Sequence, residues 1–175
     1  MNANLSPDTH TAAEVARLLR LVPLDQEGGY FRRTAEAATI NPAGGRRAWS
    51  MIYSLITPEG FSALHRLTTD EIWCFHAGDA LESLRLRPDG GGEWVKLGLN
   101  FAAGERAQDV VPAQTWQGTR LVPGGRWALV SCVVVPEFVW SDFELGERTI
   151  LAAAWPAFAE GIAALTRIQP VIGTK

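Results

Sequence analysis

Cysteine and histidine are scarce in this chain. Of its 175 residues only two are cysteines and three are histidines. Cys74 and Cys132 lie inside separate apolar runs and have no C-x-x-C spacing, as is typical of small buried thiols in a reducing compartment. We therefore expect no disulfide between them.

Long apolar stretches and one-sided charge are also missing. No window approaches the roughly 20 consecutive apolar residues that a membrane span needs, and the start MNANLSPDTHTAAEV lacks the basic-then-apolar order of a signal peptide. The net charge is −3, and the basic residues are scattered instead of forming a sustained basic face. We therefore expect a cytoplasmic protein with neither a membrane nor a nucleic acid as partner.

Apolar residues make up 47% of the sequence, which is enough for one well-buried core. We expect a single domain over residues 1–175. At its start, Thr11 and Glu14 form a capping-box pattern ahead of apolar residues at helical spacing. This pattern predicts a helix over about residues 11–22, ended by Pro23.

The middle of the chain, about residues 27–147, has a different sequence pattern. Short apolar runs alternate with turn sequences such as NPAGG, TPEG, PDGGG and VPGG, many at the 8–12 residue spacing of an antiparallel barrel or sandwich. In AWSMIYSLI, apolar and aromatic side chains alternate with Ser50 and Ser54, as in a half-buried strand. After Glu147 the chain becomes rich in Ala and Leu, which predicts short helices over about residues 148–168. The fold class predicted is all-β with helical ends.

Four ordered blocks make the prediction more specific: EGGYFRRT, HRLTTDEIWCFHAGD, VVPAQTWQGTRL and SDFELGER. Together they resemble the cupin superfamily, and in particular the uncharacterised branch known as domain of unknown function 985, whose members are often labelled predicted sugar epimerases. Gly60, His65, Glu71 and Gly78 match the first cupin motif, and Gly104 and Pro112 match the start of the second. The resemblance implies a double-stranded β-helix, the jelly-roll barrel, over nearly the whole chain.

The resemblance also implies where a metal would be held, and the sequence departs from it there. Metal-binding cupins use two histidines and a glutamate from the first motif and a histidine from the second. Here Leu67 and Gln117 stand at two of these four positions. Because leucine cannot bind a metal and an amide oxygen is a poor ligand for transition metals, we expect no metal and no other cofactor. A degenerate metal site of His65, Glu71 and Gln117 is the weaker alternative.

In the resembling family the EGGYFRRT segment borders the pocket and commonly takes part in the dimer. Carried onto this sequence, Glu27, Tyr30 and Arg32 become candidates for ligand binding, and Arg32 suits an anionic group such as phosphate or carboxylate. The opposing interpretation is that Gly28 and Gly29 serve only a backbone bend.

Strand alternation divides the HRLTTDEIWCFHAGD block into two faces. If the cupin alignment holds, His65, Glu71, Trp73 and Phe75 point into the barrel, while Cys74 and His76 point away from it. His65 and Glu71 then form either a buried pair that satisfies its own hydrogen bonds or an acid/base pair in an apolar cavity. Neighbouring candidates at the mouth of the pocket are Tyr53, Trp116 and Gln117.

Three functions remain open. The first is a metal-independent isomerase or epimerase of a carbonyl-activated sugar or similar polar metabolite, with His65, Glu71 and a tyrosine, Tyr53 or Tyr30, as catalytic residues. The second is a cupin that binds a small, possibly anionic metabolite without turning it over. The third is a metalloenzyme with the degenerate site. In each case we expect a homodimer, because the apolar edge strands of small jelly rolls need covering.

Overall fold

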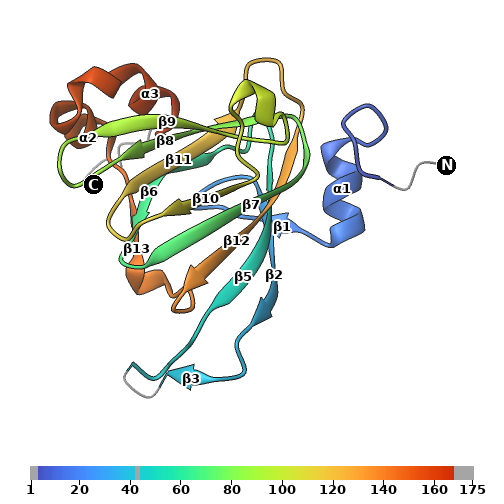
Figure 1. The fold of residues 1–175 in the computed structure, drawn as a ribbon, viewed down its shortest axis with the longest axis horizontal. Helices are drawn as coiled ribbons and strands as arrows, with labels where there is room; N and C mark the ends of the chain where they lie inside the picture. The colour runs from blue at the N-terminus through green and yellow to red at the C-terminus, as the bar shows by residue number, and fades with distance from the viewer. Residues whose placement is uncertain (1–3, 42–43, 168–175) are drawn as a thin grey trace, which may run out of the picture.

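The computed structural model describes residues 4–41 and 44–167, and two antiparallel sheets packed face to face form its body (Figure 1). The first is six-stranded, in the order β1 (Val22–Pro23), β2 (Tyr30–Glu36), β5 (Ser50–Ile56), β12 (Ala128–Val135), β7 (Asp70–Gly78) and β10 (Gln108–Val111). The second is five-stranded, in the order β13 (Phe143–Leu145), β6 (Ser62–Leu67), β11 (Trp116–Leu121), β8 (Leu81–Leu86) and β9 (Gly92–Leu97). The predicted all-β jelly roll with helical ends is confirmed.

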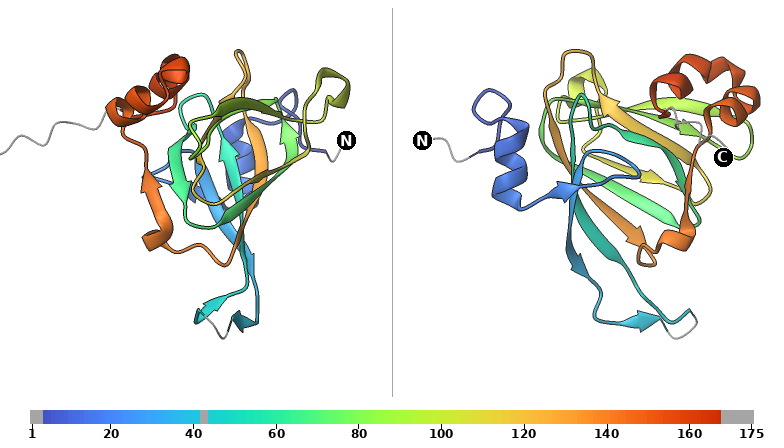
Figure 2. Two further views of the ribbon diagram at one scale, coloured as in Figure 1. Left: turned by 60° about the vertical axis from the view of Figure 1, so that its left-hand side comes forward. Right: turned by 180° about the vertical axis from the view of Figure 1, so that it is seen from behind.

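A short ribbon extends from the end of the six-stranded sheet. It consists of β3 (Ile40–Asn41) and β4 (Arg46–Arg47), which pair only with each other. In Figures 1 and 2 this ribbon projects away from the body of the sandwich.

The N-terminal helix α1 (Ala12–Leu19) has the predicted capping box. The Thr11 side chain accepts from the backbone N–H of Glu14, and the Glu14 carboxylate accepts from that of Thr11. The helix ends earlier than predicted, because Arg20 takes the left-handed conformation and its N–H closes the last turn. Val22 and Pro23 have then already joined the sheet as β1.

The C-terminal segment is helical as predicted: α2 (Arg148–Ala154) and α3 (Ala159–Ala164) are joined by the 3₁₀ turn η3 (Pro156–Phe158). Two further 3₁₀ turns are η1 (Phe101–Ala103) and η2 (Trp140–Asp142). Residue 168, the predicted end of this segment, lies outside the described residues. No helix in the described part of the chain combines the length and apolar character required to cross a bilayer.

Three apolar clusters show how the layers are filled. The interior of the sandwich holds Trp73, Phe75 and nine other buried side chains. α1 covers the outer face of the six-stranded sheet, where Val15 packs near Leu55 and Leu129. α2 and α3 cover the outer face of the five-stranded sheet, so that they lie on the opposite side of the barrel from α1 (Figure 2).

Because helices cover parts of the outer faces, both faces of a strand can be buried. In β5 the apolar face with Leu55 and Tyr53 packs outward under α1, and the face with Ser50 and Ile52 turns toward the barrel interior. The alternation predicted for this strand is present. Its more apolar side, however, is the outer one, so that Tyr53 points away from the barrel interior.

Candidate functional site

A small cavity of about 80 Å³ opens between the two sheets at one end of the barrel. Its polar wall consists of Glu27, His65 and Glu71, with the Cys132 thiol beside them. His65 and Glu71 retain only 2% and 7% of their accessible surface. Four aromatic rings also line it: Phe31, Phe138, Trp140 and Phe143.

Glu27 reaches the cavity from the loop that precedes β2. The backbone carbonyl of Glu27 accepts from the Ala63 N–H of β6, and its carboxylate accepts from the Ser62 hydroxyl at 2.5 Å. The loop packs closely against Leu55 of β5, and only a glycine at position 29 allows this. The φ of Gly29 is +73°, and a Cβ there would come within 2.6 Å of the Leu55 carbonyl oxygen. A Cβ at Gly60 would come within 2.8 Å of the Gly29 Cα. The two glycines therefore set the position of Glu27.

The His65 imidazole lies between the two carboxylates. Its Nδ1 is 2.8 Å from the Ala63 carbonyl oxygen, to which it donates, and 3.8 Å from Glu27 Oε1. Its Nε2 is 4.0 Å from Glu71 Oε2, too long for a direct hydrogen bond. The ring stacks on Phe143 with centroids 5.2 Å apart, which fixes its plane.

The carboxylates decide the charge of this imidazole. Burial alone would lower the pKa of His65, but the negative charges of Glu27 and Glu71 outweigh it and raise the pKa to about 9. Burial also raises the pKa of Glu27, and it raises that of the Cys132 thiol well above its ordinary value. At neutral pH His65 is therefore an acid and Cys132 a neutral thiol.

Behind Glu71 the polar groups continue into the barrel. The Gln117 amide nitrogen donates to Glu71 Oε2 at 2.6 Å, and its oxygen accepts from Trp73 Nε1 at 3.0 Å and Arg85 Nη1 at 3.1 Å. Arg85 is itself buried and pairs with Asp109 at 3.1 Å. The result is a continuous chain of buried hydrogen bonds from Asp109 to Glu71.

The degenerate metal site does not fit this arrangement. The Gln117 oxygen, the atom that would bind a cation, faces Trp73 and Arg85 and already accepts two hydrogen bonds. Leu67 occupies the cavity wall where the family has a second histidine. Within residues 4–41 and 44–167, no group of three or more His, Cys, Asp or Glu side chains is placed to hold a metal ion. The three residues of this alternative are thus arranged for hydrogen bonding.

The structure brings some predicted site residues together and separates others. Glu27, His65 and Glu71 meet at the cavity, and Gln117 and Trp73 lie behind Glu71. Phe75 points inward as predicted, but it lies deeper in the core and does not line the cavity.

Tyr30, Arg32 and Tyr53, predicted at the pocket, do not line this cavity. Tyr30 and Tyr53 pack against the cluster under α1, and Arg32 pairs in register with Tyr53 and so shares its outward direction. Since side chains alternate along a strand, their neighbours Phe31 and Arg33 line the cavity instead.

Trp116, also predicted at the pocket, lies on the outer face of its strand. It packs with Leu84 and Leu151 beneath the C-terminal helices, with the Arg66 guanidinium 4.7 Å from its ring centroid. His76 and Cys74 point away from the cavity, as predicted. His76 Nε2 is 2.9 Å from the Ser131 hydroxyl, and its ring meets Tyr53 edge-on at 5.7 Å.

Sequence reasoning missed several residues of the site. Arg85 and Asp109 belong to no motif and are 24 positions apart, although the placement of Arg85 between Leu84 and Leu86 is a weak signal of a buried charge. Cys132 was predicted only as a buried thiol. The aromatic rings from residues 138–143 lie beyond the second cupin motif and had no assigned role.

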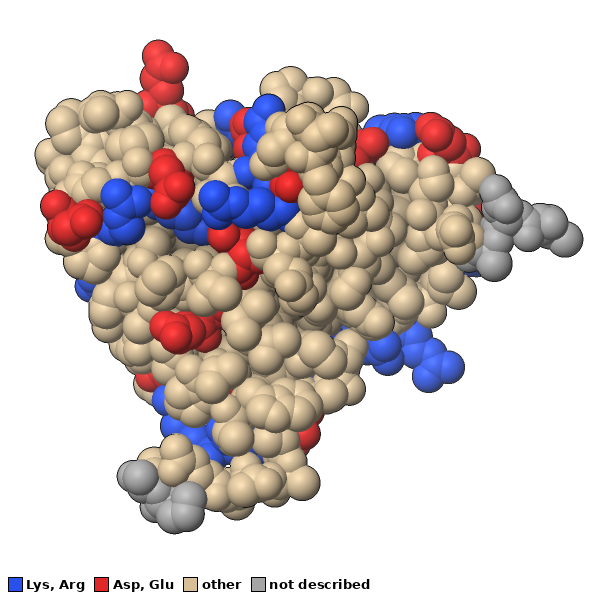
Figure 3. All heavy atoms as spheres, in the orientation of Figure 1, with Lys and Arg blue, Asp and Glu red and all other residues tan. Residues whose placement is uncertain are grey.

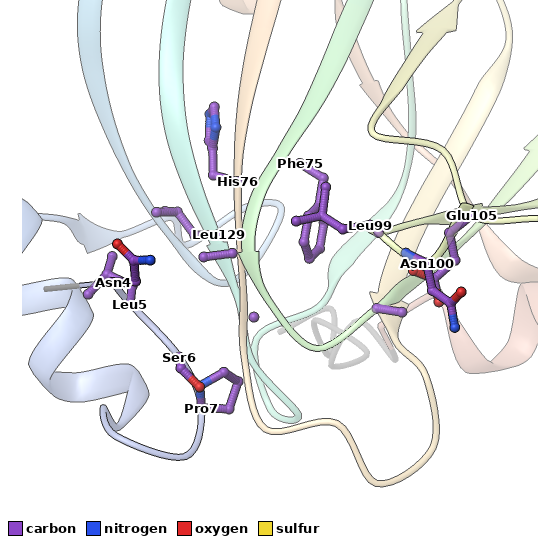
Figure 4. A pocket seen from close by; sticks show the side chains of 14 residues that line it. Asn4, Leu5, Ser6, Pro7, Phe75, His76, Leu99, Asn100, Glu105 and Leu129 are labelled. Carbon is purple, nitrogen blue, oxygen red and sulfur yellow. Dashed lines mark hydrogen bonds between the residues drawn. The ribbon is translucent and has the colours of Figure 1, made fainter. Parts of the chain in front are cut away.

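A second, wider hollow lies on the outer surface near the N-terminal segment (Figure 4). Its volume is about 680 Å³, with Leu5 and Ser6 on one side and Leu99 and Asn100 on the other. Its one carboxylate, Glu105, accepts from the Asn100 backbone N–H. On the face shown in Figure 3, basic and acidic side chains lie close to one another. The barrel cavity, with its buried ionisable groups, is therefore the better candidate site.

Comparisons with known proteins agree with this fold. The family model described as "Cupin superfamily (DUF985)" matches residues 13–146. An uncharacterized protein of Saccharomyces cerevisiae is 28% identical over 159 residues, covering 80% of this chain and 79% of that protein. A protein from Shewanella oneidensis is 36% identical, with a TM-score of 0.83 over 91% of this chain and 99% of that one. A hypothetical protein from Leishmania major is 32% identical, with a TM-score of 0.82 over 91% and 100%.

Proposed function

The chain belongs to the cupin superfamily, in its DUF985 branch, and from this premise and the chemistry of the cavity we propose that it is a small-molecule isomerase. Its reaction would be a proton shift on a carbonyl-activated sugar or a related polar metabolite, performed by its own side chains without a resident metal. The observation that carries the proposal is a buried imidazole between two carboxylates, the buried Glu71 and the 20% exposed Glu27.

This arrangement holds the two groups that a proton shift needs. At neutral pH the His65 imidazolium can donate a proton to a carbonyl oxygen, because its pKa is raised to about 9. A carboxylate beside it can remove the proton from the adjacent carbon. The sequence favoured His65, oriented by Glu71, as the base and either Tyr53 or Tyr30 as the acid. The raised pKa of His65 and the outward position of Tyr53 support an acidic His65 and a carboxylate base instead.

The size of the cavity limits what enters it. Its volume of about 80 Å³ accommodates about three water molecules, at roughly 30 Å³ each. Only the reacting carbonyl end of a metabolite fits, and the remainder would lie among Phe138, Trp140 and Phe143 at the mouth. Arg33, also at the cavity, takes the role of anion contact that the sequence assigned to Arg32.

Proton exchange with deuterated water tests the proposal directly. The protein is incubated in D₂O with a panel of aldoses, ketoses, their phosphates and nucleotide-linked ketosugars, and α-proton loss is followed by ¹H NMR. We expect exchange on at least one compound, a decrease of about 100-fold or more in His65→Gln, and a rate within about twofold of wild type in Tyr53→Phe, the matched outer-face control. Absence of exchange across the panel contradicts the proposal.

Binding without turnover is the second candidate, and the small closed cavity favours it. Such a protein would use Glu27, His65 and Glu71 only to hydrogen-bond its ligand. A compound that raises the melting temperature of the wild type but not of His65→Gln, and that is recovered without deuterium, would support binding over catalysis.

We also propose a homodimer, as expected from the edge strands. β10 is an edge strand of the six-stranded sheet, and Val110 on it is 58% exposed. Val135, at the end of β12 in the same sheet, is 45% exposed. Light scattering should give twice the chain mass of 19.1 kDa; a monomer at micromolar concentration contradicts the dimer.

A further inference from the structure

The two carboxylates beside His65 have hydrogen-bond partners of different chemistry. Glu71 Oε2 faces the Gln117 amide nitrogen at 2.6 Å, and Glu27 Oε1 faces the Ser62 hydroxyl at 2.5 Å. An amide NH₂ can only donate, whereas a hydroxyl can either donate or accept. The partner of Glu71 thus favours its ionised form, and the partner of Glu27 accommodates both forms.

The orientation of Gln117 is fixed from behind. Its oxygen accepts from Trp73 Nε1 and Arg85 Nη1, which can only donate. Turning the amide over would place its NH₂ against these two donors and its oxygen against the Glu71 carboxylate. The NH₂ group of Gln117 therefore points permanently at Glu71.

Arg85 is in turn held by a buried carboxylate. Its guanidinium donates to Asp109 Oδ2 through both Nε and Nη2, and the two side chains are only 5% and 9% exposed. Arg106 contacts the other Asp109 oxygen at 3.2 Å from the surface side. The pair supplies a rigid donor to Gln117, and no comparable support contacts the Glu27 carboxylate among the described residues.

From this asymmetry, and resting on the proposed function, we infer that the two glutamates have separate roles. Glu27 is the catalytic carboxylate that takes and returns the substrate proton. Glu71 is the counter-ion of the His65 imidazolium, and Gln117 and Arg85 are positioning residues that hold its carboxylate in place.

The resulting reaction is balanced without a further reactant. Glu27 removes the proton from the carbon next to the carbonyl, and the C–H electron pair forms the double bond of an enediol as His65 gives its Nε2 proton to the carbonyl oxygen. His65 then takes the proton of the neighbouring hydroxyl, and Glu27 returns its own proton to the former carbonyl carbon. Both side chains end in their starting states.

The surroundings of Glu27 suit a group that exchanges protons. Burial raises its pKa above the ordinary value, while the charge of His65 opposes this rise. The ionisable groups near it are His65, Glu71, Arg33 and Cys132 around the cavity, together with Arg167, which contacts the Glu27 backbone carbonyl at 3.4 Å.

Carboxyl ¹³C NMR tests the assignment independently of turnover. Protein labelled at the glutamate δ-carbon is titrated as wild type, Glu27→Gln and Glu71→Gln. We expect one carboxyl signal that titrates above the usual glutamate range, that disappears in Glu27→Gln and that persists in Glu71→Gln. The reverse pattern, or no such signal in the wild type, overturns the inference.

A second variant tests the positioning residues. The double substitution Arg85→Met with Asp109→Leu removes the buried pair without leaving a lone charge. We expect the Glu71 carboxyl signal at pH 7 to move from its wild-type chemical shift, because Gln117 loses one of the two donors that orient its amide, with the Glu27 signal retained. If the Glu71 signal keeps its wild-type chemical shift in a folded double variant, Arg85 has no positioning role.

Activity separates this inference from the proposed function. Once an exchanging compound is known, Glu27→Gln should lose about 100-fold or more in rate. Glu71→Gln should move the alkaline limb of the pH profile, set by His65, to lower pH. If no compound exchanges but the NMR pattern appears as expected, the assignment of charges stands and the proposed activity fails.

Discussion

The inner and outer faces of the barrel carry similar residue types in different settings. His65 and Arg85 lie inside, each close to a buried carboxylate. His76 and Arg66 lie on outer faces, where His76 contacts the Ser131 hydroxyl and Arg66 pairs with Glu144, which is 54% exposed. The inner groups are removed from water and depend on one another, whereas the outer groups retain solvent. A residue type alone therefore does not identify a site, and its enclosure decides what it can do.

The largest expected difference is between the unfolding free energies of variants at Arg85 and at Arg66. Arg85→Met removes the inner partner of Asp109, although Arg106 still contacts the other carboxylate oxygen. We therefore expect the free energy of unfolding to fall by about 3 kcal/mol, the lower end of the range for breaking a buried pair. Arg66→Met removes an exposed pair and should cost no more than about 1 kcal/mol. Urea unfolding at pH 7 measures both. Equal losses in the two variants would remove the distinction between the faces.

The two histidines should respond to pH in opposite directions. The folded-state pKa of His65 is raised from 6.5 to about 9. Its contribution to the free energy of unfolding is therefore complete below pH 6.5 and is lost as the pH rises to about 9. The loss amounts to about 3 kcal/mol at 1.36 kcal/mol per unit. Glu27, whose pKa is also raised, adds a loss that begins at lower pH, above its ordinary value of 4.5.

Burial lowers the pKa of His76, so its contribution is instead lost as the pH falls through 6.5 and below. Urea unfolding from pH 5.5 to 9.5 in wild type, His65→Gln and His76→Gln measures these slopes. A wild-type stability that does not fall between pH 6.5 and 9, or a fall that is undiminished in His65→Gln, contradicts the charge assigned to His65.

The smallest effect is expected for an outer tyrosine. Tyr53→Phe keeps the ring that packs under α1 and should change stability by no more than about 0.5 kcal/mol. Its inner counterpart Trp73→Phe removes a hydrogen bond to Gln117 and leaves a void in the core, for an expected loss of about 2 kcal/mol. Thermal and urea unfolding of the two variants give the comparison, and a larger loss in Tyr53→Phe would reverse it.

The motif spacing was sufficient to predict the fold and part of the site. His65, Glu71 and Gln117 occupy cupin motif positions, and the jelly roll brings them together with Glu27. Local chemistry was equally informative at the N-terminus, where the side chains of Thr11 and Glu14 alone specify the start of α1.

The direction of each strand face was harder to predict. On a half-exposed strand, polarity tells the inside from the outside. In β2 and β5 both faces are covered, one by the other sheet and one by α1 or its cluster, so that Phe31 and Tyr30 are equally plausible inward residues from sequence alone. The Arg85–Asp109 pair could not be predicted from the sequence for another reason, because only the arrangement of β8, β11, β7 and β10 brings the two residues together.

The close contact between Gly29 and Gly60 has a consequence for how this protein tolerates mutation. Neither residue has a side chain to offer a ligand, and yet any side chain there collides with backbone and displaces the loop that carries Glu27. In a deep mutational scan scored by function, positions 29 and 60 should therefore be as intolerant as position 27 itself. Gly44, where an added Cβ would meet no atom within 4 Å, should accept most substitutions.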